Sequence, residues 1–212
     1  MKKLFSGFLF DMDGTLVNSK SVIEKTWKDF SNTHKLDYTS VINYAHGRKT
    51  QETVTHFLGK NEKSLKIAKT IEQHEIITTQ GIIPVPGALQ ILEKIHPEHL
   101  AVVTSASREL CINRLQAAGL PCPKFIVSAE DVVCGKPDPE GYFLGAQLLG
   151  LAIEDILIFE DAQAGIQAAL KTCASLAIVG SCDASAGKEL ARIPDFTKIQ
   201  IMRSKNRYMV MF

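Results

Sequence analysis

The chain has 212 residues, of which 45% are apolar and 22% charged, a balance typical of a soluble globular protein with one sizeable core and room for a small second domain. The formal net charge of +1 leaves no basic excess that would point to nucleic acid or a membrane surface. Lys2 and Lys3 precede an apolar run, but Asp11 and Asp13 interrupt it too early for a signal peptide. No stretch approaches the ~18 apolar residues that a membrane span needs.

The cysteines are scattered and form neither a C-x-x-C pair nor a spacing typical of a metal site. They are Cys111, Cys122, Cys134, Cys173 and Cys182. An odd, scattered set predicts reduced thiols and a cytoplasmic protein. With the near-neutral charge, we expect no nucleic-acid partner and no membrane partner, and we expect the chain to be a monomer.

The first predicted strand is Phe8–Phe10, an apolar run that ends abruptly at two acids, Asp11 and Asp13, and a glycine, Gly14. Gly14 suits a sharp turn, which frees Asp13 to swing over the strand end. Two close carboxylates repel each other unless a cation or a proton lies between them, and Mg²⁺ favours such oxygen ligands. A carboxylate can also act as a nucleophile and form a phospho-aspartate. The alternative is a solvated turn, because Asp and Gly are ordinary turn residues.

Residues 18–83 contain no convincing strand and are predicted to be helical. Helical spacing is followed by Val22, Ile23, Trp27 and Phe30, and further helices are expected over Ser40–Ala45, Thr50–Leu58 and Ser64–Thr79. Pro84-Val85-Pro86-Gly87 marks the return to the main domain. The pattern predicts a core of residues 1–17 and 84–212 and a small α-helical cap of residues 18–83. Such an insertion beside a strand end predicts a lid, and the alternative is extra packing.

From Ala88 onward, predicted strands and helices alternate. The strands are Leu100–Val103, Phe125–Val127, Ile156–Phe159 and Ser175–Val179, and the helices are Ala88–Ile95, Arg108–Ala118, a helix from Asp138-Pro139 to Gly150, and Ala162–Leu170. This alternation predicts right-handed βαβ units, and therefore an α/β fold with a Rossmann-like parallel sheet covered by helices on both faces. The tail instead predicts a β-hairpin of Ile199–Ile201 and Tyr208–Val210.

Polar residues follow the carboxyl ends of the predicted core strands, which meet at one edge of a parallel sheet. They are Asp11 and Asp13, Thr104 and Ser105, Lys136 in the loop after the third core strand, and Glu160 and Asp161. Carboxylates hold Mg²⁺, a lysine neutralises phosphate charge, and hydroxyls with helix N-terminal N–H groups cradle phosphate oxygens. Each piece alone is an ordinary cap or loop residue. Their occurrence at successive strand ends predicts a phosphoryl-transfer site.

Four segments carry these residues, in the order Asp11-Met12-Asp13-Gly14-Thr15, Val103-Thr104-Ser105, Gly135-Lys136-Pro137-Asp138-Pro139 and Phe159-Glu160-Asp161-Ala162-Gln163-Ala164-Gly165-Ile166. They resemble the four motifs of the haloacid dehalogenase-like hydrolase superfamily, and the resemblance covers essentially the whole chain. The helical insertion resembles the small cap of the branch that holds phosphoglycolate phosphatases and β-phosphoglucomutases. Within that branch the chain looks most like bacterial small sugar-phosphate phosphatases.

The resemblance implies a role for each matching residue. Asp11 resembles the nucleophile and Asp13 the general acid–base, while Thr104, Ser105 and Lys136 would bind the phosphate, with Lys136 also neutralising charge on Asp11. The implied Mg²⁺ ligands are Asp11, the backbone carbonyl of Asp13, and Asp161, with Glu160 in support. In the cap, Gly47 and Arg48 resemble a loop that touches substrate, and His46 beside them is a further candidate contact.

The leading prediction is a Mg²⁺-dependent phosphatase acting on a small phosphorylated metabolite, a sugar or polyol phosphate. A sugar phosphomutase of the same fold would use every residue above, and its dependence on a sugar bisphosphate would identify it. A phospho-aspartate receiver domain also combines acids, a hydroxyl and a lysine around Mg²⁺, but it needs no helical lid and carries its phosphoacceptor on an interior strand. The sequence does not name the substrate.

Overall fold

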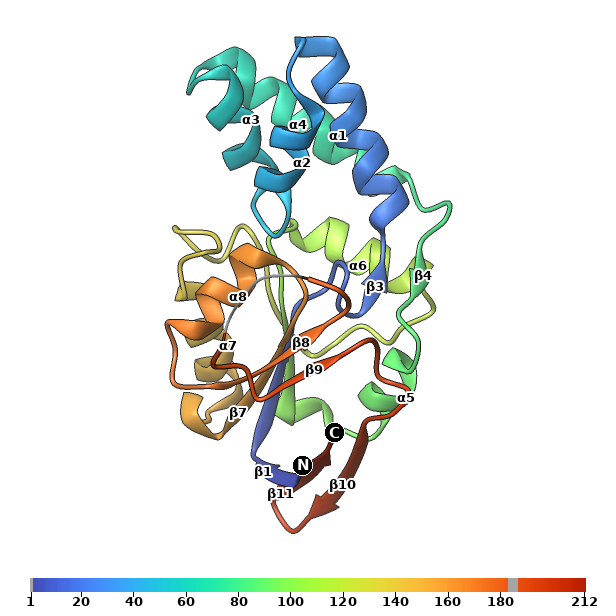
Figure 1. Cartoon of the computed structure of the whole chain (residues 1–212), viewed down its shortest axis with the longest axis vertical. Coiled ribbons are helices and arrows are strands. Elements are labelled where there is room, and N and C mark those ends of the chain that lie inside the picture. The colour runs from blue at the N-terminus through green and yellow to red at the C-terminus, as the bar shows by residue number, and fades with distance from the viewer. Residues whose placement is uncertain (1, 183–186) are drawn as a thin grey trace.

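A parallel sheet of six strands forms the centre of the structure, a computed structural model that describes residues 2–182 and 187–212 (Figure 1). In their order across the sheet the strands are β6 (Phe125–Val127), β5 (Leu100–Val103), β2 (Gly7–Phe10), β7 (Ile156–Glu160), β8 (Ser175–Val179) and β9 (Ala191–Ile193). Every neighbouring pair is parallel. The chain builds outward from β2 to β6 on one side and then returns to β7 on the other. This reversal beside β2 is where open α/β sheets bind ligands.

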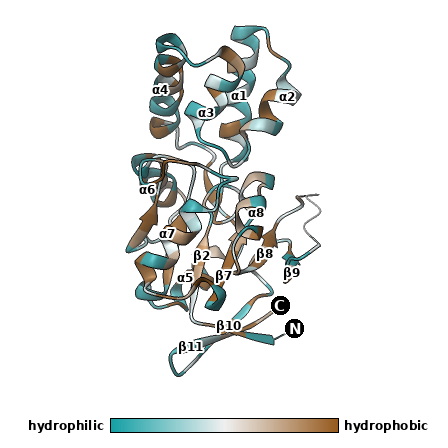
Figure 2. Cartoon of the chain, turned by 90° about the vertical axis from the view of Figure 1, so that its left-hand side faces the viewer, coloured by the Kyte–Doolittle hydropathy of each residue, from teal (hydrophilic) through white to brown (hydrophobic). Residues whose placement is uncertain are grey.

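Helices cover both faces of the sheet, as the sequence predicts. On β2, Phe8 and Phe10 point to one face and Leu9 to the other, and all three are fully buried. The first face packs against α5 (Ala88–Glu93) and α6 (Arg108–Ala117), and the second against α7 (Glu140–Leu149) and α8 (Gln163–Leu170). Burial of each such side chain contributes about 1.5–3 kcal/mol to the free energy of folding. Strands buried on both faces are therefore apolar, as the brown central strands in Figure 2 show.

The two strands that carry acids are fixed by aromatic packing. The rings of Phe10 and Phe159 stack with centroids 4.9 Å apart, and Phe196 packs edge-on against both. Buried aromatic pairs add about 0.5–1.5 kcal/mol beyond their area. The ends of β2 and β7 are therefore held rigidly beside each other.

A four-helix unit, Lys20–Ile77, sits at one end of the sheet, and we call it the cap (Figure 1). Its helices are α1 (Lys20–His34), α2 (Tyr38–Ala45), α3 (Thr50–Leu58) and α4 (Glu62–Ile77). The cap has its own small core, in which Trp27 and Phe30 pack edge to face. The two chain segments that join it to the sheet pair with each other as antiparallel strands, β3 (Val17–Asn18) and β4 (Ile83–Pro84). This double connection restricts how the cap can move.

A second, three-stranded antiparallel sheet lies at the end opposite the cap (Figures 1 and 2). It contains the predicted hairpin, β10 (Gln200–Ser204) and β11 (Arg207–Met211), together with β1 (Lys2–Phe5), which the sequence did not predict. Three of the four β1 residues are exposed, so β1 lacks the buried run that marks a strand, and its partner lies about 200 residues away. β9 was not predicted either.

The helix starts shift slightly from their predicted positions. The helix predicted from Asp138-Pro139 begins at Glu140, and the Asp138 carboxylate accepts a bond from the Glu140 N–H at 2.9 Å. The five cysteines all carry free thiols. Within the described residues no helix combines the length and apolar character needed to cross a bilayer.

Candidate active site

Asp11 directly continues β2, since its backbone N–H donates to the Phe159 carbonyl at 2.9 Å. The chain then turns at Gly14, where φ is +85°. A Cβ at Gly14 would lie 2.0 Å from Asp161 Oδ2, so only glycine lets the turn pass this close to the end of β7. The turn therefore brings the two acid-bearing strand ends within reach of each other.

Lys136 lies at the centre of the site. Its Nζ donates to Asp11 Oδ1 at 2.5 Å, to Glu160 Oε1 at 2.8 Å and to the Val103 carbonyl at 3.1 Å. Lys136 is 5% exposed and Glu160 is completely buried. Burial alone would lower the pKa of Lys136, but the two carboxylates raise it well above its usual value. The two carboxylates therefore favour the charged form of Lys136, which bridges the loop after β6 to both acid-bearing strands.

Glu160 is fixed on all sides. Besides Lys136, its oxygens accept bonds from the Tyr142 hydroxyl at 3.2 Å and the Ala162 N–H at 2.7 Å. Gly165 makes room for it, because a Cβ there would lie 1.5 Å from Glu160 Oε1. Neither the role of Tyr142 nor that of Gly165 was predicted from the sequence, although Gly165 stands in the fourth motif.

Asp11, Glu160 and Asp161 form the one group of potential metal ligands among the described residues, with one oxygen of each within 4.8 Å of the others. Thr15 donates to Asp161 Oδ1 at 3.1 Å. Burial, only partly offset by Lys136, raises the pKa of Asp11 to about 7, and burial with the neighbouring carboxylates raises that of Asp161. Carboxylates that resist ionisation together fit a divalent cation, and an all-oxygen set suits Mg²⁺, Ca²⁺ or Mn²⁺.

The two hydroxyls that follow β5 line a narrow cavity together with Lys136 and the cap residue Lys49. The Thr104 hydroxyl accepts a bond from the Ala106 N–H at 3.1 Å. The Ser105 hydroxyl donates to the Gly47 carbonyl of the cap at 2.8 Å. Thr104 and Lys136 thus line the same cavity, whereas Ser105 joins the core to the cap.

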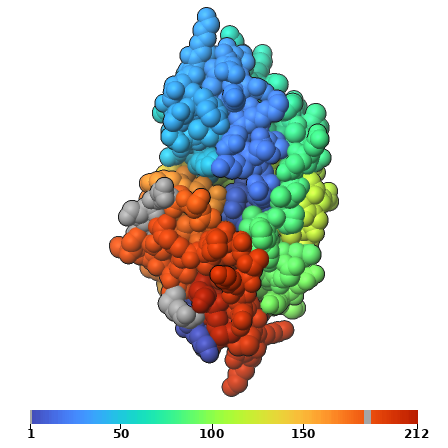
Figure 3. All heavy atoms as spheres, turned by 45° about the vertical axis from the view of Figure 1, so that its right-hand side comes forward, coloured from blue at the N-terminus to red at the C-terminus, as the bar shows by residue number. Residues whose placement is uncertain are grey.

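The cap rests on the core through the loop between α2 and α3. Lys49 Nζ donates to the carbonyls of Ala129 and Val132 at 2.9 and 2.8 Å. Figure 3 shows the cyan edge of the cap against the orange segment around α8, where a Cβ on Gly47 would lie 2.9 Å from the Ala162 Cβ. Lys49 was not predicted, since its partners are backbone carbonyls 80 and 83 residues away.

The other two predicted cap residues differ in their placement. The Arg48 guanidinium lies 4.6 Å from the Tyr44 ring centre, a cation–π contact within the cap. Burial and the nearby Lys20 charge lower the pKa of His46, whereas the charges of Glu24, Asp13 and Glu160 oppose that shift. No hydrogen bond or ion pair joins the exposed His46 side chain to the acids among the described residues, and Arg48 packs on its own unit.

Asp13 lies apart from the three-carboxylate group. Its Oδ1 accepts from the Ser19 hydroxyl at 2.5 Å, and its Oδ2 from Arg114 Nη1 at 2.6 Å. Arg114 also donates from Nη2 to Glu75 of the cap at 3.0 Å. This arrangement was not predicted from the sequence. A signal was present, because Arg114 follows Leu110 and Cys111 at helical spacing and so stands on the buried stripe of α6. A metal role for the Asp13 backbone carbonyl stays a prediction.

The chain is similar to known proteins in both sequence and fold. A family model described as haloacid dehalogenase-like hydrolase matches residues 8–179. Hexitol phosphatase A of Escherichia coli is 39% identical over 182 residues, or 84% of each chain. Glycerol-1-phosphate phosphohydrolase 2 of Saccharomyces cerevisiae is 32% identical over 171 residues, covering 76% of this chain and 68% of that one. A β-phosphoglucomutase structure from Clostridium difficile shares the fold, with a TM-score of 0.76 at 20% identity over 92% of this chain and 93% of that one.

Proposed function

This chain belongs to the haloacid dehalogenase-like hydrolase family, and from that premise we propose that it is a Mg²⁺-dependent phosphatase of a small sugar or polyol phosphate, acting through a phospho-aspartate. The observation that carries the proposal is the buried contact of Lys136 with both Asp11 and Glu160, beside Asp161. Relatives named as phosphatases of a hexitol and of glycerol-1-phosphate support the substrate class. We also propose that residues 18–83 serve as the cap domain of a core formed by residues 1–17 and 84–212.

In the proposed first step, Asp11 attacks the phosphorus atom. Lys136 occupies Asp11 Oδ1, so the attacking atom is Oδ2, which accepts no bond from the described residues. As the Asp11–phosphorus bond forms, the bond from phosphorus to the sugar oxygen breaks, and that oxygen takes a proton from Asp13. Proton donation to a poor alkoxide leaving group contributes about 10²–10⁴-fold. Lys136 and the Thr104 hydroxyl hold the phosphoryl oxygens.

In the second step a water oxygen attacks the phosphorus atom. Asp13 takes the proton of this water, the bond to Asp11 breaks, and inorganic phosphate leaves. Splitting the hydrolysis in this way replaces one very slow reaction with two easier ones. Mg²⁺ bound by Asp11 and Asp161, with Glu160 in support, would neutralise charge on the phosphoryl group.

A panel of sugar, polyol and glycolate phosphates, assayed for phosphate release with Mg²⁺ or with EDTA, tests this function. Metal-dependent release from a few sugar or polyol phosphates supports it. No release from any member by folded protein contradicts it. Conversion of a sugar phosphate that needs catalytic amounts of a sugar bisphosphate would instead identify the phosphomutase.

We expect the stability gained from Mg²⁺ to rise as the pH increases through about 7, because protons and the cation compete for the same carboxylates. In the metal-free fold the pKa of Asp11 is raised from 3.8 to about 7, chiefly by burial. The folded chain therefore keeps a proton that the unfolded chain loses, and this contribution to stability, present at low pH, is lost as the pH rises toward 7. Melting curves with Mg²⁺ and with EDTA measure the difference, and an equal Mg²⁺ effect at pH 5 and pH 8 would contradict it.

Gly47→Ala is expected to lower kcat/KM by about tenfold or more, because the added methyl group meets Ala162 and keeps the cap off the core. Gly59→Ala is the matched control. Both glycines lie in cap loops with positive φ, +74° and +78°, so each variant loses about 1–3 kcal/mol of stability to backbone strain. The nearest atom to a Cβ at Gly59 is 3.7 Å away, within the cap. If the two variants lose activity equally, cap seating is not the cause.

A cytoplasmic location and a monomeric state stay predictions. Sedimentation at the protein concentration used for kinetics tests the second.

A further inference from the structure

Arg114 has an unusual position for an arginine. It is 3% exposed, and its guanidinium joins two carboxylates from different parts of the chain, Asp13 at the end of β2 and Glu75 in the cap. Its Nε has no hydrogen-bond partner among the described residues, so the guanidinium binds through its two Nη atoms alone. Burying a charged group costs free energy unless the group is paired. Arg114 has two such pairs, one with Asp13 in the core and one with Glu75 in the cap.

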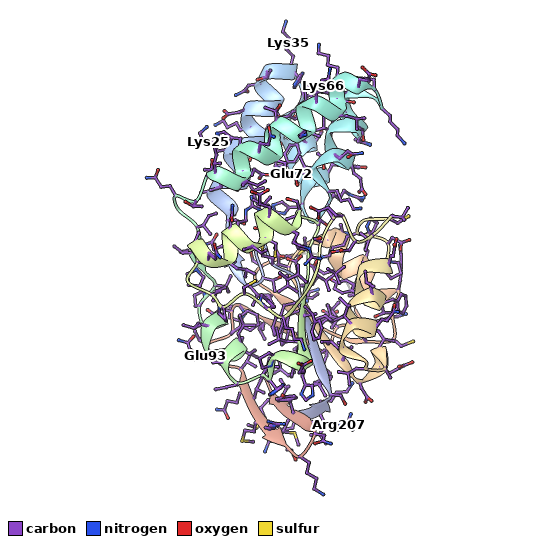
Figure 4. All side chains as sticks on the ribbon, turned by 180° about the vertical axis from the view of Figure 1, so that it is seen from behind. Lys25, Lys35, Lys66, Glu72, Glu93 and Arg207 are labelled. Carbon is purple, nitrogen blue, oxygen red and sulfur yellow. The ribbon has the colours of Figure 1, made fainter. Side chains whose placement is uncertain are left out.

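The partners of Asp13 all connect to the cap. Ser19, which binds Oδ1, immediately precedes α1, and Glu75, which binds Arg114, lies near the end of α4. Figure 4 shows α4, marked by Glu72, lying directly along α6. A further bond crosses the same boundary, from Asn113 Nδ2 to the Ile76 carbonyl at 3.3 Å. The α6 segment that carries Arg114 therefore packs against the end of α4 in the cap, through the Arg114–Glu75 and Asn113–Ile76 contacts.

We propose that Arg114 is a positioning residue that fixes the carboxylate of Asp13 and, through Glu75, makes its orientation depend on the seating of the cap. The proposal rests on the proposed function, in which Asp13 moves the proton of the leaving group. An Asp side chain has two rotatable bonds, and both its oxygens are held here, one by Ser19 and one by Arg114. A misplacement of 1 Å at a reacting group can cost about 10²-fold in rate.

The geometry requires an arginine. Nη1 and Nη2 bind different acids at 2.6 and 3.0 Å, so the rigid guanidinium sets the position of Asp13 relative to Glu75. A lysine ammonium is a flexible point charge that lacks this fork. Arg114→Lys therefore keeps the charge and loses the geometry, whereas Glu75→Gln keeps the shape and an acceptor oxygen and loses the charge.

The test compares an alkyl phosphate substrate with 4-nitrophenyl phosphate. The alkyl ester is the best substrate of the panel. Its leaving group needs the proton, whereas nitrophenolate leaves without one. The ratio kcat/KM reports the steps up to and including transfer of the phosphoryl group to Asp11. In that transfer only the alkyl ester needs a proton from Asp13. Arg114→Lys is expected to lower kcat/KM about 10- to 100-fold for the alkyl ester and less than about threefold for the aryl ester. Glu75→Gln is expected to lower the alkyl value alone, by about 3- to 10-fold.

Arg207→Gln is the matched control, since Arg207 also pairs with a carboxylate, Asp155, but at the end of the molecule opposite the cap. It should leave both values unchanged. Equal losses for both esters, no loss, or a faster alkyl reaction in the Arg114 and Glu75 variants would each overturn the proposal. Glu75→Gln keeps the test decisive if Arg114→Lys fails to fold.

Asp13→Asn, measured beside them, separates this proposal from the proposed function. If Asp13→Asn itself affects the two esters equally, the assignment of Asp13 as the acid is wrong. If it is selective for the alkyl ester and the Arg114 variant is not, only the positioning role fails.

Discussion

Asp11→Asn is expected to reduce phosphate release by at least about 10⁴-fold without unfolding the chain, because removing the nucleophile of a covalent mechanism removes its first step. The amide keeps the shape of the carboxylate and an oxygen that can accept the bond from Lys136. Lys136 also retains Glu160 as a charged partner at 2.8 Å. Phosphate release and a melting curve, measured on the same sample, check both halves of the prediction.

Asp155→Asn is the control for this substitution. Its side chain is 48% exposed and pairs with Arg207 on the second sheet, at the end opposite the cap. We expect its activity to match that of the unmodified chain. Asp11→Asn protein that turns over at a comparable rate would show that another group attacks the phosphorus atom.

Lys136→Met is expected to abolish most activity and also to destabilise the metal-free fold by about 3–5 kcal/mol. The loss of stability arises because Asp11 and Glu160 would keep their burial and lose the only cation that contacts both of them among the described residues. The loss should be smaller at about pH 5, where the remaining carboxylates can take up protons. Added Mg²⁺ should restore part of the lost stability. It should not restore activity, because the positive charge that Lys136 places beside the phosphoryl group is still missing.

Lys171→Met is the matched control for the lysine. Lys171 is exposed, and its Nζ donates to the Pro137 carbonyl, in the loop that carries Lys136. A surface substitution of this kind changes stability by about 0.5 kcal/mol or less. Denaturant unfolding of both variants with EDTA measures the difference. If Lys136→Met is as stable as Lys171→Met, the carboxylates do not depend on Lys136 for compensation.

The sequence could predict the sheet and the acids at its edge because both are local patterns. Phe8–Phe10 and Ile156–Phe159 are short apolar runs that stop at acids, and parallel strands must end at one edge. The contact of Lys136 with Asp11 and Glu160 follows from that rule. The need for glycine at positions 14 and 165 becomes clear only from the structure, which shows how closely these positions approach Asp161 and Glu160.

The contacts between cap and core could not be predicted in the same way. Arg114 meets Asp13 and Glu75 only because α6 and α4 pack at one rotation, which no spacing along the chain fixes. Lys49 binds backbone carbonyls, which every residue offers. β1 contributes only one buried residue, and it pairs with β11 at the other end of the chain. Such contacts depend on tertiary packing and leave little trace in a local pattern.

The central claim is that Asp11 carries the phosphoryl group during turnover. The most direct measurement is acid quenching of the protein in turnover with its best substrate and Mg²⁺, followed by mass spectrometry of the peptide that contains Asp11. We predict that this peptide gains the mass of one phosphoryl group and that Asp11→Asn shows none. Product formation within a single turnover with no phosphoryl group on Asp11, or with the group on another residue, would contradict the mechanism.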